Sequence, residues 1–189
     1  MSGLLWREVG GPGVYPPQPQ GIYRFTQTAK FWKESEGPDR YRRGMYTYFW
    51  RSSPHPLLTT FDAPDATLAC TRRVRSNTPL QALTLANDAA FFEMAQALAV
   101  RVMREAPCAD LERIRHAFRV CLSRSPGEWE ARRLSEFLAE QRKHFAAAPR
   151  DAEAAAPPGR PAGVSPVEGA AWTAVARVML NLDELITRE

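Results

Sequence analysis

The second part of the chain alternates apolar and polar residues with the period of an amphipathic helix. From about residue 78 onward, apolar side chains recur at spacings of three and four. We expect four helices, over about 79–105, 110–124, 126–146 and 166–186. The first two are followed by short connections, which favours packing between sequence neighbours. The pattern therefore predicts a mainly α protein built on a compact bundle of about four amphipathic helices.

Three of these helices are preceded by the same polar pattern, in which a hydroxyl residue is followed by proline, any residue, and then Glu or Gln. The hydroxyl of such a pattern accepts a hydrogen bond from the backbone N–H three residues on, and the Glu or Gln side chain reaches back. Proline suits the first helical position, which has no need of its N–H. The predicted capping pairs are Thr78 with Gln81, Ser125 with Glu128, and Ser165 with Glu168.

Residues 1–77 lack the helical period and are rich in Gly, Pro and aromatic residues. GGPGVYPPQPQG is incompatible with regular helix, whereas RRGMYTYFWRSS favours a short strand. We expect 1–77 to form an irregular, basic, aromatic arm that packs on a helical domain, 78–189. Within that domain, residues 146–165 are rich in Ala, Pro and Gly and lack large apolar anchors, which predicts a mobile linker.

The positive charge of the chain lies in the arm. Residues 1–77 hold eleven Lys and Arg against six Asp and Glu, a net charge of +5, whereas residues 78–189 hold 14 against 15, a net charge of −1. Basic residues among aromatic ones can bind single-stranded nucleic acid. No nucleic-acid motif accompanies them here, so packing of the aromatic residues is the favoured interpretation, and weak nucleic-acid binding by the arm is an alternative.

The cysteines and histidines show no metal-binding pattern. Cys70, Cys108 and Cys121 are widely spaced, without a CxxC or a paired Cys/His spacing. We therefore expect small buried thiols, no metal site and no cofactor in this chain. There is no apolar run of about 18 residues and no signal-peptide pattern at the N-terminus, so we expect neither a membrane segment nor a membrane partner.

The helix predicted to begin at Pro79 carries polar residues where its apolar stripe should continue. Asn87 lies four residues after Leu83 and so falls on the stripe, and Asp88 follows it. A buried polar group must find a partner or cost about 1–3 kcal/mol. We favour a polar lock that pins the preceding loop to the helix, with a ligand contact and solvent exposure as alternatives. The residues that would supply either the lock or the ligand site are Arg72, Arg73, Arg75, Asn77, Asn87 and Asp88.

The stretch FDAPD holds the residues best suited to acid–base chemistry. Asp62 and Asp65 lie near His55, and two carboxylates with an imidazole are the usual components of such a site. The same stretch is also typical of a turn in which the aspartates accept backbone N–H bonds. The turn is the favoured interpretation, and the three residues remain the candidates for catalysis.

Several longer motifs occur in order along nearly the whole chain, apart from 146–165. They are GGPGVYPPQPQG, YRRGMYTYFWRSSPHP, TTFDAPD, RRVRSNTPLQALTLAND, ERIRHAFRVCLSRSP and NLDELITRE. Together they resemble the C-terminal domain of large planctomycete proteins associated with cytochrome c, the PSD-one family (domain of unknown function fifteen fifty-three).

The resemblance implies a setting rather than an activity, because no established activity is attached to the family. It implies haem only in upstream, CxxCH-containing regions, none of which is present here. The chain resembles a truncated C-terminal portion, so the expected partners are the missing upstream domains or a companion polypeptide. Family context suggests an exported or cell-envelope protein, whereas a native start at Met1 would suggest the cytoplasm.

We therefore expect an uncharacterised helical module with an assembly or ligand-binding role and no self-contained catalysis. The alternative is a fragment of an enzyme that acts on a polysaccharide or another polar substrate, with a site between the arm and the first long helix. The sequence does not indicate a substrate, a redox role or an oligomeric state.

Overall fold

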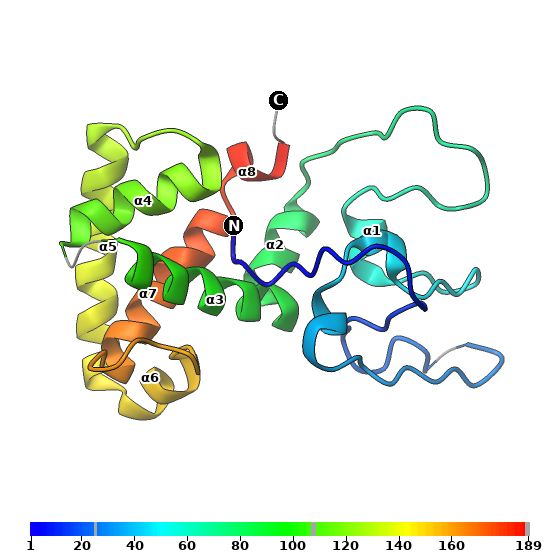
Figure 1. Ribbon diagram of the computed structural model, residues 1–189, viewed down its shortest axis with the longest axis horizontal. Coiled ribbons are helices and arrows are strands. Elements are labelled where there is room, and N and C mark those ends of the chain that lie inside the picture. The colour runs from blue at the N-terminus through cyan, green and yellow to red at the C-terminus, as the bar shows by residue number, and fades with distance from the viewer. Residues whose placement is uncertain (25, 107–108, 188–189) are drawn as a thin grey trace. The chain divides into compact units, whose positions relative to one another are not determined.

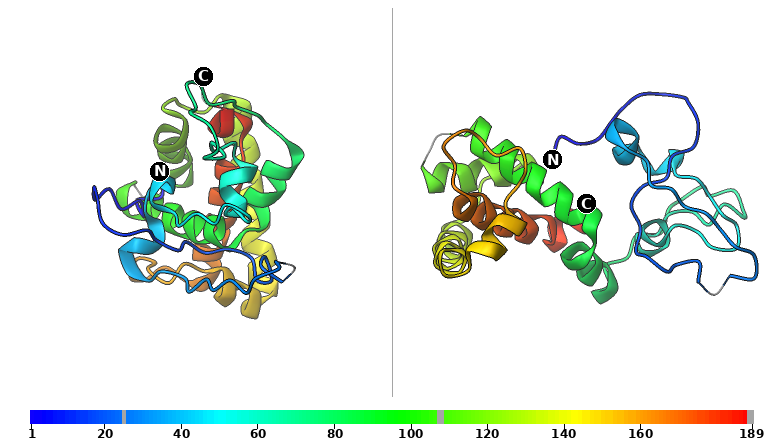
Figure 2. Two further views of the ribbon diagram at one scale, coloured as in Figure 1. Left: turned by 90° about the vertical axis from the view of Figure 1, so that its right-hand side faces the viewer. Right: turned by 90° about the horizontal axis from the view of Figure 1, so that it is seen from below.

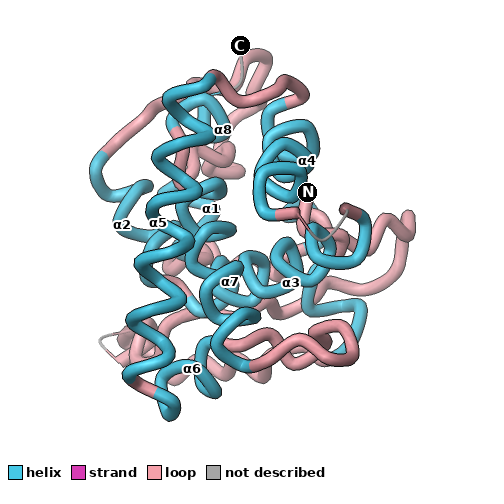
Figure 3. The backbone as a smooth tube through the Cα atoms, turned by 90° about the vertical axis from the view of Figure 1, so that its left-hand side faces the viewer, coloured by secondary structure: helices cyan, strands magenta, loops and turns pink. Residues whose placement is uncertain are grey.

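The regular structure of the protein is helical. The computed structural model describes residues 1–24, 26–106 and 109–187, and within them no strand is formed (Figures 1 and 3). The prediction of a mainly α protein is confirmed. The elements are the 3-10 helices η1 (Gly37–Tyr41) and η2 (Gly44–Tyr46), and the α-helices α1 (Pro56–Thr60), α2 (Pro79–Asn87), α3 (Ala89–Glu105), α4 (Asp110–Leu122), α5 (Glu128–Ala147), α6 (Pro149–Ala155), α7 (Pro166–Leu180) and α8 (Asp183–Thr187).

The chain forms two compact units. One is Leu4–Ala90, and the other is Phe91–Glu189 together with Met1–Gly3. The division falls after the first two residues of α3, so α2 belongs to the same unit as the arm. The composition change near residue 77 lies earlier in the chain than this division.

The unit Leu4–Ala90 is built mostly from irregular chain, seen as the blue to cyan trace in Figure 2. Its distant segments meet through single bridges rather than a sheet. Val14 donates to the Tyr46 carbonyl and accepts from the Tyr48 N–H, both at 2.8 Å. The strand expected in RRGMYTYFWRSS does not form, because Gly44–Tyr46 turn into η2. Two isolated bridges take its place, one between Trp6 and Arg42 and one between Val14 and Thr47.

Aromatic packing gives the arm an ordered centre. The ring of Tyr15 lies edge-on to Trp32 and stacked on Tyr48, with centroid distances of 5.0 Å in both pairs. The indole N–H of Trp32 donates to the Pro16 carbonyl at 2.9 Å. Such pairs contribute about 0.5–1.5 kcal/mol beyond their area burial, so the aromatic residues of the arm stabilise this unit in place of regular backbone pairing.

The second unit is organised around α7. This helix packs against α4, α5, α6 and α8 (Figure 1). Its residues Trp172 and Met179 lie in the core with at most 1% exposure. The other large, fully buried apolar side chains of this core are Leu98, Val102, Ile114, Phe118, Leu138 and Val175.

No helix among the described residues is long and apolar enough to cross a bilayer.

The segment 146–165, for which the sequence predicted a mobile linker, contains a helix and buried side chains. It contains α6, and Ala152, Ala156 and Pro157 are buried. At Gly169 of α7, an added Cβ would lie 3.0 Å from the Pro157 ring and 3.6 Å from Ala156. Because glycine allows this close approach, small side chains provide the packing that we had expected only from large ones.

Two further helix predictions needed correction in their boundaries. The helix expected over 166–186 ends at Leu180 and is followed by the separate α8. The helix expected from 126 begins at Glu128, whereas the helix expected over 110–124 agrees closely with α4. The helix expected over 79–105 is divided at Asp88, for a reason that concerns the candidate site.

Candidate functional site

The unit Leu4–Ala90 contains a network of polar bonds centred on Asp62, here called the lock, which differs from the predicted lock of Asn87 and Asp88. The carboxylate oxygen Oδ2 of Asp62 accepts from the Ser76 backbone N–H at 2.8 Å and from the Ser76 hydroxyl at 2.7 Å. The guanidinium of Arg73 donates to the carbonyls of Asp62, at 2.9 Å, and Phe61. These bonds join the two ends of the loop that connects α1 to α2.

Gln81 connects the lock to α2. Its side chain is 1% exposed, and its amide nitrogen lies 2.9 Å from the Thr60 carbonyl, 3.0 Å from the Ser76 hydroxyl and 3.3 Å from Asp62 Oδ2. Its amide oxygen accepts from the Thr78 N–H at 3.0 Å, and the Thr78 hydroxyl accepts from the Gln81 N–H at 3.3 Å. The capping box of Thr78 and Gln81 is therefore confirmed. Its burial and its bonds to the preceding loop were not predicted from the sequence.

The surroundings of Asp62 suit a structural carboxylate rather than a general base. The hydrogen bonds from the Ser76 side chain and backbone hold the pKa of Asp62 below its usual range, and Gln81 and Arg73 act in the same direction. A general base works best with a pKa near the operating pH, which for a carboxyl requires a raised pKa. The residue also has a left-handed backbone, with φ of 55°, which fits the turn interpretation of FDAPD.

Asp65 also serves the turn. Its side chain accepts from the Thr67 N–H at 3.0 Å, and this bond lowers the pKa of its carboxyl. The loop that follows is exposed, and it includes Arg72 and Arg75; Asn77, nearer to the lock, is exposed as well. Arg73, one of the three arginines proposed for the lock, takes part in it.

His55 is buried, with 2% exposure, at the start of α1. Its Nδ1 accepts from the Leu57 N–H at 3.3 Å, which leaves Nε2 to donate to the Pro17 carbonyl at 3.0 Å. The ring also lies 5.5 Å from that of Trp32. Burial lowers the pKa of His55, so the neutral form is favoured. Both ring nitrogens are used in holding α1 on the arm.

Asn87 and Asp88 have different roles from those expected. Asn87 is exposed, and its amide donates to the Leu83 carbonyl of its own helix at 2.8 Å. Asp88 ends α2 with an extended backbone, and its side chain accepts from the Ala90 N–H at 2.9 Å. An aspartate in this conformation is a helix N-cap, which explains why the helix expected over 79–105 is interrupted here. The prediction that both residues take part in the lock was wrong.

The buried and exposed faces of α2 are the reverse of the predicted ones. Leu80 and Leu83 are 59% and 60% exposed, whereas Gln81 and Leu85 are 1% and 8% exposed. The helix has no charged residue, so its sequence does not distinguish the two faces strongly. The polar bonds of Gln81 decide which side is buried, and two leucines remain on the outer face.

Of the other two predicted capping pairs, Ser165 with Glu168 forms in part. Ser165 accepts from the Glu168 N–H at 3.2 Å, but the Glu168 carboxylate binds Arg142, with the shortest contact at 2.6 Å, and Trp172. Burial acts to raise the pKa of Glu168, but the bonds from Arg142 and Trp172 outweigh it and lower the pKa. Glu168 thus stabilises the core of its unit rather than reaching back to its own cap.

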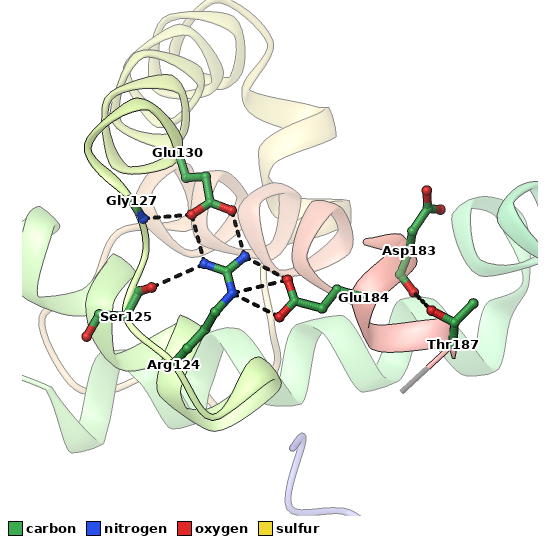
Figure 4. Close-up of polar contacts among 7 residues, drawn as sticks. All are labelled: Arg124, Ser125, Gly127, Glu130, Asp183, Glu184 and Thr187. Carbon is green, nitrogen blue, oxygen red and sulfur yellow. Dashed lines mark hydrogen bonds and ion pairs between the residues drawn. The ribbon is translucent and has the colours of Figure 1, made fainter. Parts of the chain in front are cut away.

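Ser125 and Glu128 form no capping box, because the arginine before them organises this turn differently (Figure 4). Glu130 accepts from the Gly127 N–H at 2.7 Å. The guanidinium of Arg124 binds the carboxylates of both Glu130 and Glu184, at 2.7 Å in each case. These bonds lower the pKa of both carboxyls and raise that of Arg124. Arg124 thereby ties α8 to the start of α5.

Metal or thiol chemistry gains no support from the described residues. They contain no group of three or more His, Cys, Asp or Glu side chains that could hold a metal ion. Cys121 is buried as expected, whereas Cys70 is exposed, and Cys108 lies outside the described residues.

Comparison with known proteins finds one family. Residues 1–138 match PSD1, described as "Protein of unknown function (DUF1553)". No curated protein and no solved structure matches the chain.

Proposed function

Because the chain belongs to the PSD1 family of proteins of unknown function, we propose that it is a helical binding module of a larger assembly, without self-contained catalysis. The observation that carries this proposal is the outer face of α2, where Leu80 and Leu83 are 59% and 60% exposed. Full burial of one such side chain stabilises a protein or complex by about 1.5–3 kcal/mol. Because each leucine is about 60% exposed, a partner that covered both would gain more than half of this free energy from each side chain.

The alternative of an enzyme fragment finds less support in the same unit. Its candidates for acid–base chemistry, Asp62, Asp65 and His55, each accept hydrogen bonds from within the fold, and their pKa values are shifted away from neutrality. By contrast, Thr84 and Asn87 of α2 donate to carbonyls of their own helix, and the apolar side chains of Leu80 and Leu83 are exposed. Binding through apolar contacts therefore suits the exposed groups better than catalysis does.

We take the partner to be an upstream portion of the same protein or a companion polypeptide. The similarity of the motifs to the C-terminal domain of cytochrome-associated proteins supports this choice. In that arrangement, haem would be carried by the partner, and this chain would contribute an apolar docking face.

Photocrosslinking tests the proposal. A benzophenone amino acid placed at Leu83, in cells that naturally produce the protein, should form a specific cross-link to one polypeptide. The matched control places the same group at Lys33, an exposed position of the same unit. Equal cross-linking at both positions would contradict the proposal. So would hydrolysis of a polysaccharide by the purified chain that is lost in Asp62→Asn.

A further inference from the structure

The loop Pro64–Arg75, between α1 and α2, is a second surface that its own unit leaves uncovered. All twelve of its residues are exposed, and Figure 1 shows the connection as a long excursion between the two helices. Leu68 and Val74 are 82% and 75% exposed. Both apolar side chains are therefore available for burial by a partner.

The loop is held at its base. The guanidinium of Arg73 donates hydrogen bonds to the carbonyls of Phe61 and Asp62. The Asp62 carboxylate accepts from both the N–H and the hydroxyl of Ser76. Near its start, Asp65 accepts from the Thr67 N–H. Because these bonds fix the ends of the loop, part of the ordering entropy of binding is already lost in the free protein.

The charge of the loop indicates the kind of partner. It holds three arginines, no lysine and a single acidic residue, Asp65, whose side chain bonds within the turn. Arg72 is exposed between the two apolar residues Leu68 and Val74. Arginine is enriched at protein interfaces, where its planar group binds carboxylates, whereas lysine is depleted.

A protein partner explains this composition better than a membrane or a nucleic acid does. The loop has no Trp or Tyr, the residues that anchor proteins at a membrane surface. It also offers no aromatic ring on which a base of single-stranded nucleic acid could stack.

We propose that the loop Pro64–Arg75 is a preformed docking element for an acidic protein surface, with Leu68 and Val74 entering an apolar groove and Arg72 binding carboxylates on its rim. This inference rests on the proposed role as a binding module and names the chemistry of the partner. The leucines of α2 belong to a separate element, so the two surfaces can be tested separately.

The experiment uses a phage-displayed library of random peptides, selected on the full chain and followed by affinity measurements with the selected peptides. We expect these peptides to combine Asp or Glu with apolar residues. The dissociation constant should rise about tenfold or more in the double variant Leu68→Asp, Val74→Asp, and severalfold in Arg72→Glu. Val9→Asp, which changes an apolar residue that is 86% exposed in the same unit, should bind as the unchanged chain does.

The other outcomes overturn the proposal. Selected peptides without acidic residues, or peptides that bind the loop variants equally well, would remove the loop as the docking element. In the second case the module role would survive, since cross-linking at Leu83 tests it independently. Two further measurements use the Leu68→Asp, Val74→Asp variant. If the unchanged chain binds phosphatidylglycerol-containing vesicles and the variant does not, the loop docks on a membrane instead. If the unchanged chain forms a dimer and the variant does not, the loop docks on a second copy instead. A library that yields no binder would refute the loop proposal, while the cross-link at Leu83 would still decide the module role.

Discussion

Replacement of Gln81 by Met tests whether the buried amide holds the loop on α2. Met has a similar length and no polar atoms that could replace the amide. The change removes the donors to the Thr60 carbonyl and the Ser76 hydroxyl and the acceptor for the Thr78 N–H, at 2.9, 3.0 and 3.0 Å. It should therefore destabilise the unit Leu4–Ala90 without creating a large cavity.

The magnitude follows from the number of bonds lost. Each hydrogen bond contributes about 0.5–1.5 kcal/mol net, so three contribute about 1.5–4.5 kcal/mol. Burial of the Met side chain offsets roughly 1 kcal/mol of this loss. We expect Gln81→Met to lower the free energy of unfolding by about 0.5–3.5 kcal/mol.

A second substitution at the same position adds a pH signature. Gln81→Glu keeps an acceptor for Thr78 but places a carboxylate where the amide nitrogen lies 3.3 Å from Asp62 Oδ2. Two like charges repel only while both are ionised. The Glu variant should be less stable than the Met variant at neutral pH, and the difference should shrink as the pH falls through the range of carboxyl pKa values, about 4.

Because the chain has two compact units, the assay must report on one of them. The indole N–H resonance of Trp32, which donates to the Pro16 carbonyl, is a suitable probe during urea titration. Leu83→Gln is the matched control on the exposed face of α2 and should change stability by less than about 0.5 kcal/mol. If Gln81→Met shifts the Trp32 transition no more than this control, the lock does not hold the unit together.

Three more changes test other parts of the fold. His55→Asn should flatten the acid loss of stability below about pH 6.5. The pKa of His55 is lowered in the folded chain, so the unfolded chain binds the proton first and stability falls as the pH drops below the unfolded pKa. Urea midpoints measured across this range would show it. Arg142→Met should lower stability by about 1–3 kcal/mol at pH 7, and it should weaken the acid dependence below about pH 4, because bonds from Arg142 help to hold the pKa values of Asp110 and Glu168 low. Calorimetry at two pH values would detect both effects. Trp172→Ala should lower the free energy of unfolding by about 3–5 kcal/mol, because it leaves a cavity in the core of the second unit. Urea unfolding followed by circular dichroism would measure this loss. If Arg142→Met or Trp172→Ala left the free energy of unfolding nearly unchanged, the packing described above would be contradicted.

Local patterns in the sequence predicted local structure well. The helical period located α4 closely, and the capping box at Thr78 and Gln81 located the start of α2. The turn interpretation of FDAPD agrees with the bonds of Asp62 and Asp65 to nearby backbone. These features depend on residues close together in sequence, which is why a single chain reveals them.

The features that failed depend on tertiary context. The period of α2 indicated a buried stripe through Leu83, but a helix that is apolar on two sides is oriented by its partners, and the bonds of Gln81 turn the other side inward. Similarly, Ala156 and Gly169 in the second unit pack closely although neither has a large side chain. Neither outcome can be inferred from the hydrophobicity of one segment.

The position of α7 has a consequence for how the protein is made. The unit Leu4–Ala90 has all its residues once Ala90 has been synthesised, whereas the core around Trp172 needs α7, which ends at Leu180. At about 5–20 residues per second, the ribosome takes roughly 5–20 s to cover this interval. Once α3, α4 and α5 have been synthesised, they present apolar faces until α7 is complete. A nascent-chain chaperone should therefore associate most strongly with chains stalled after α5, and release them once α7 has emerged.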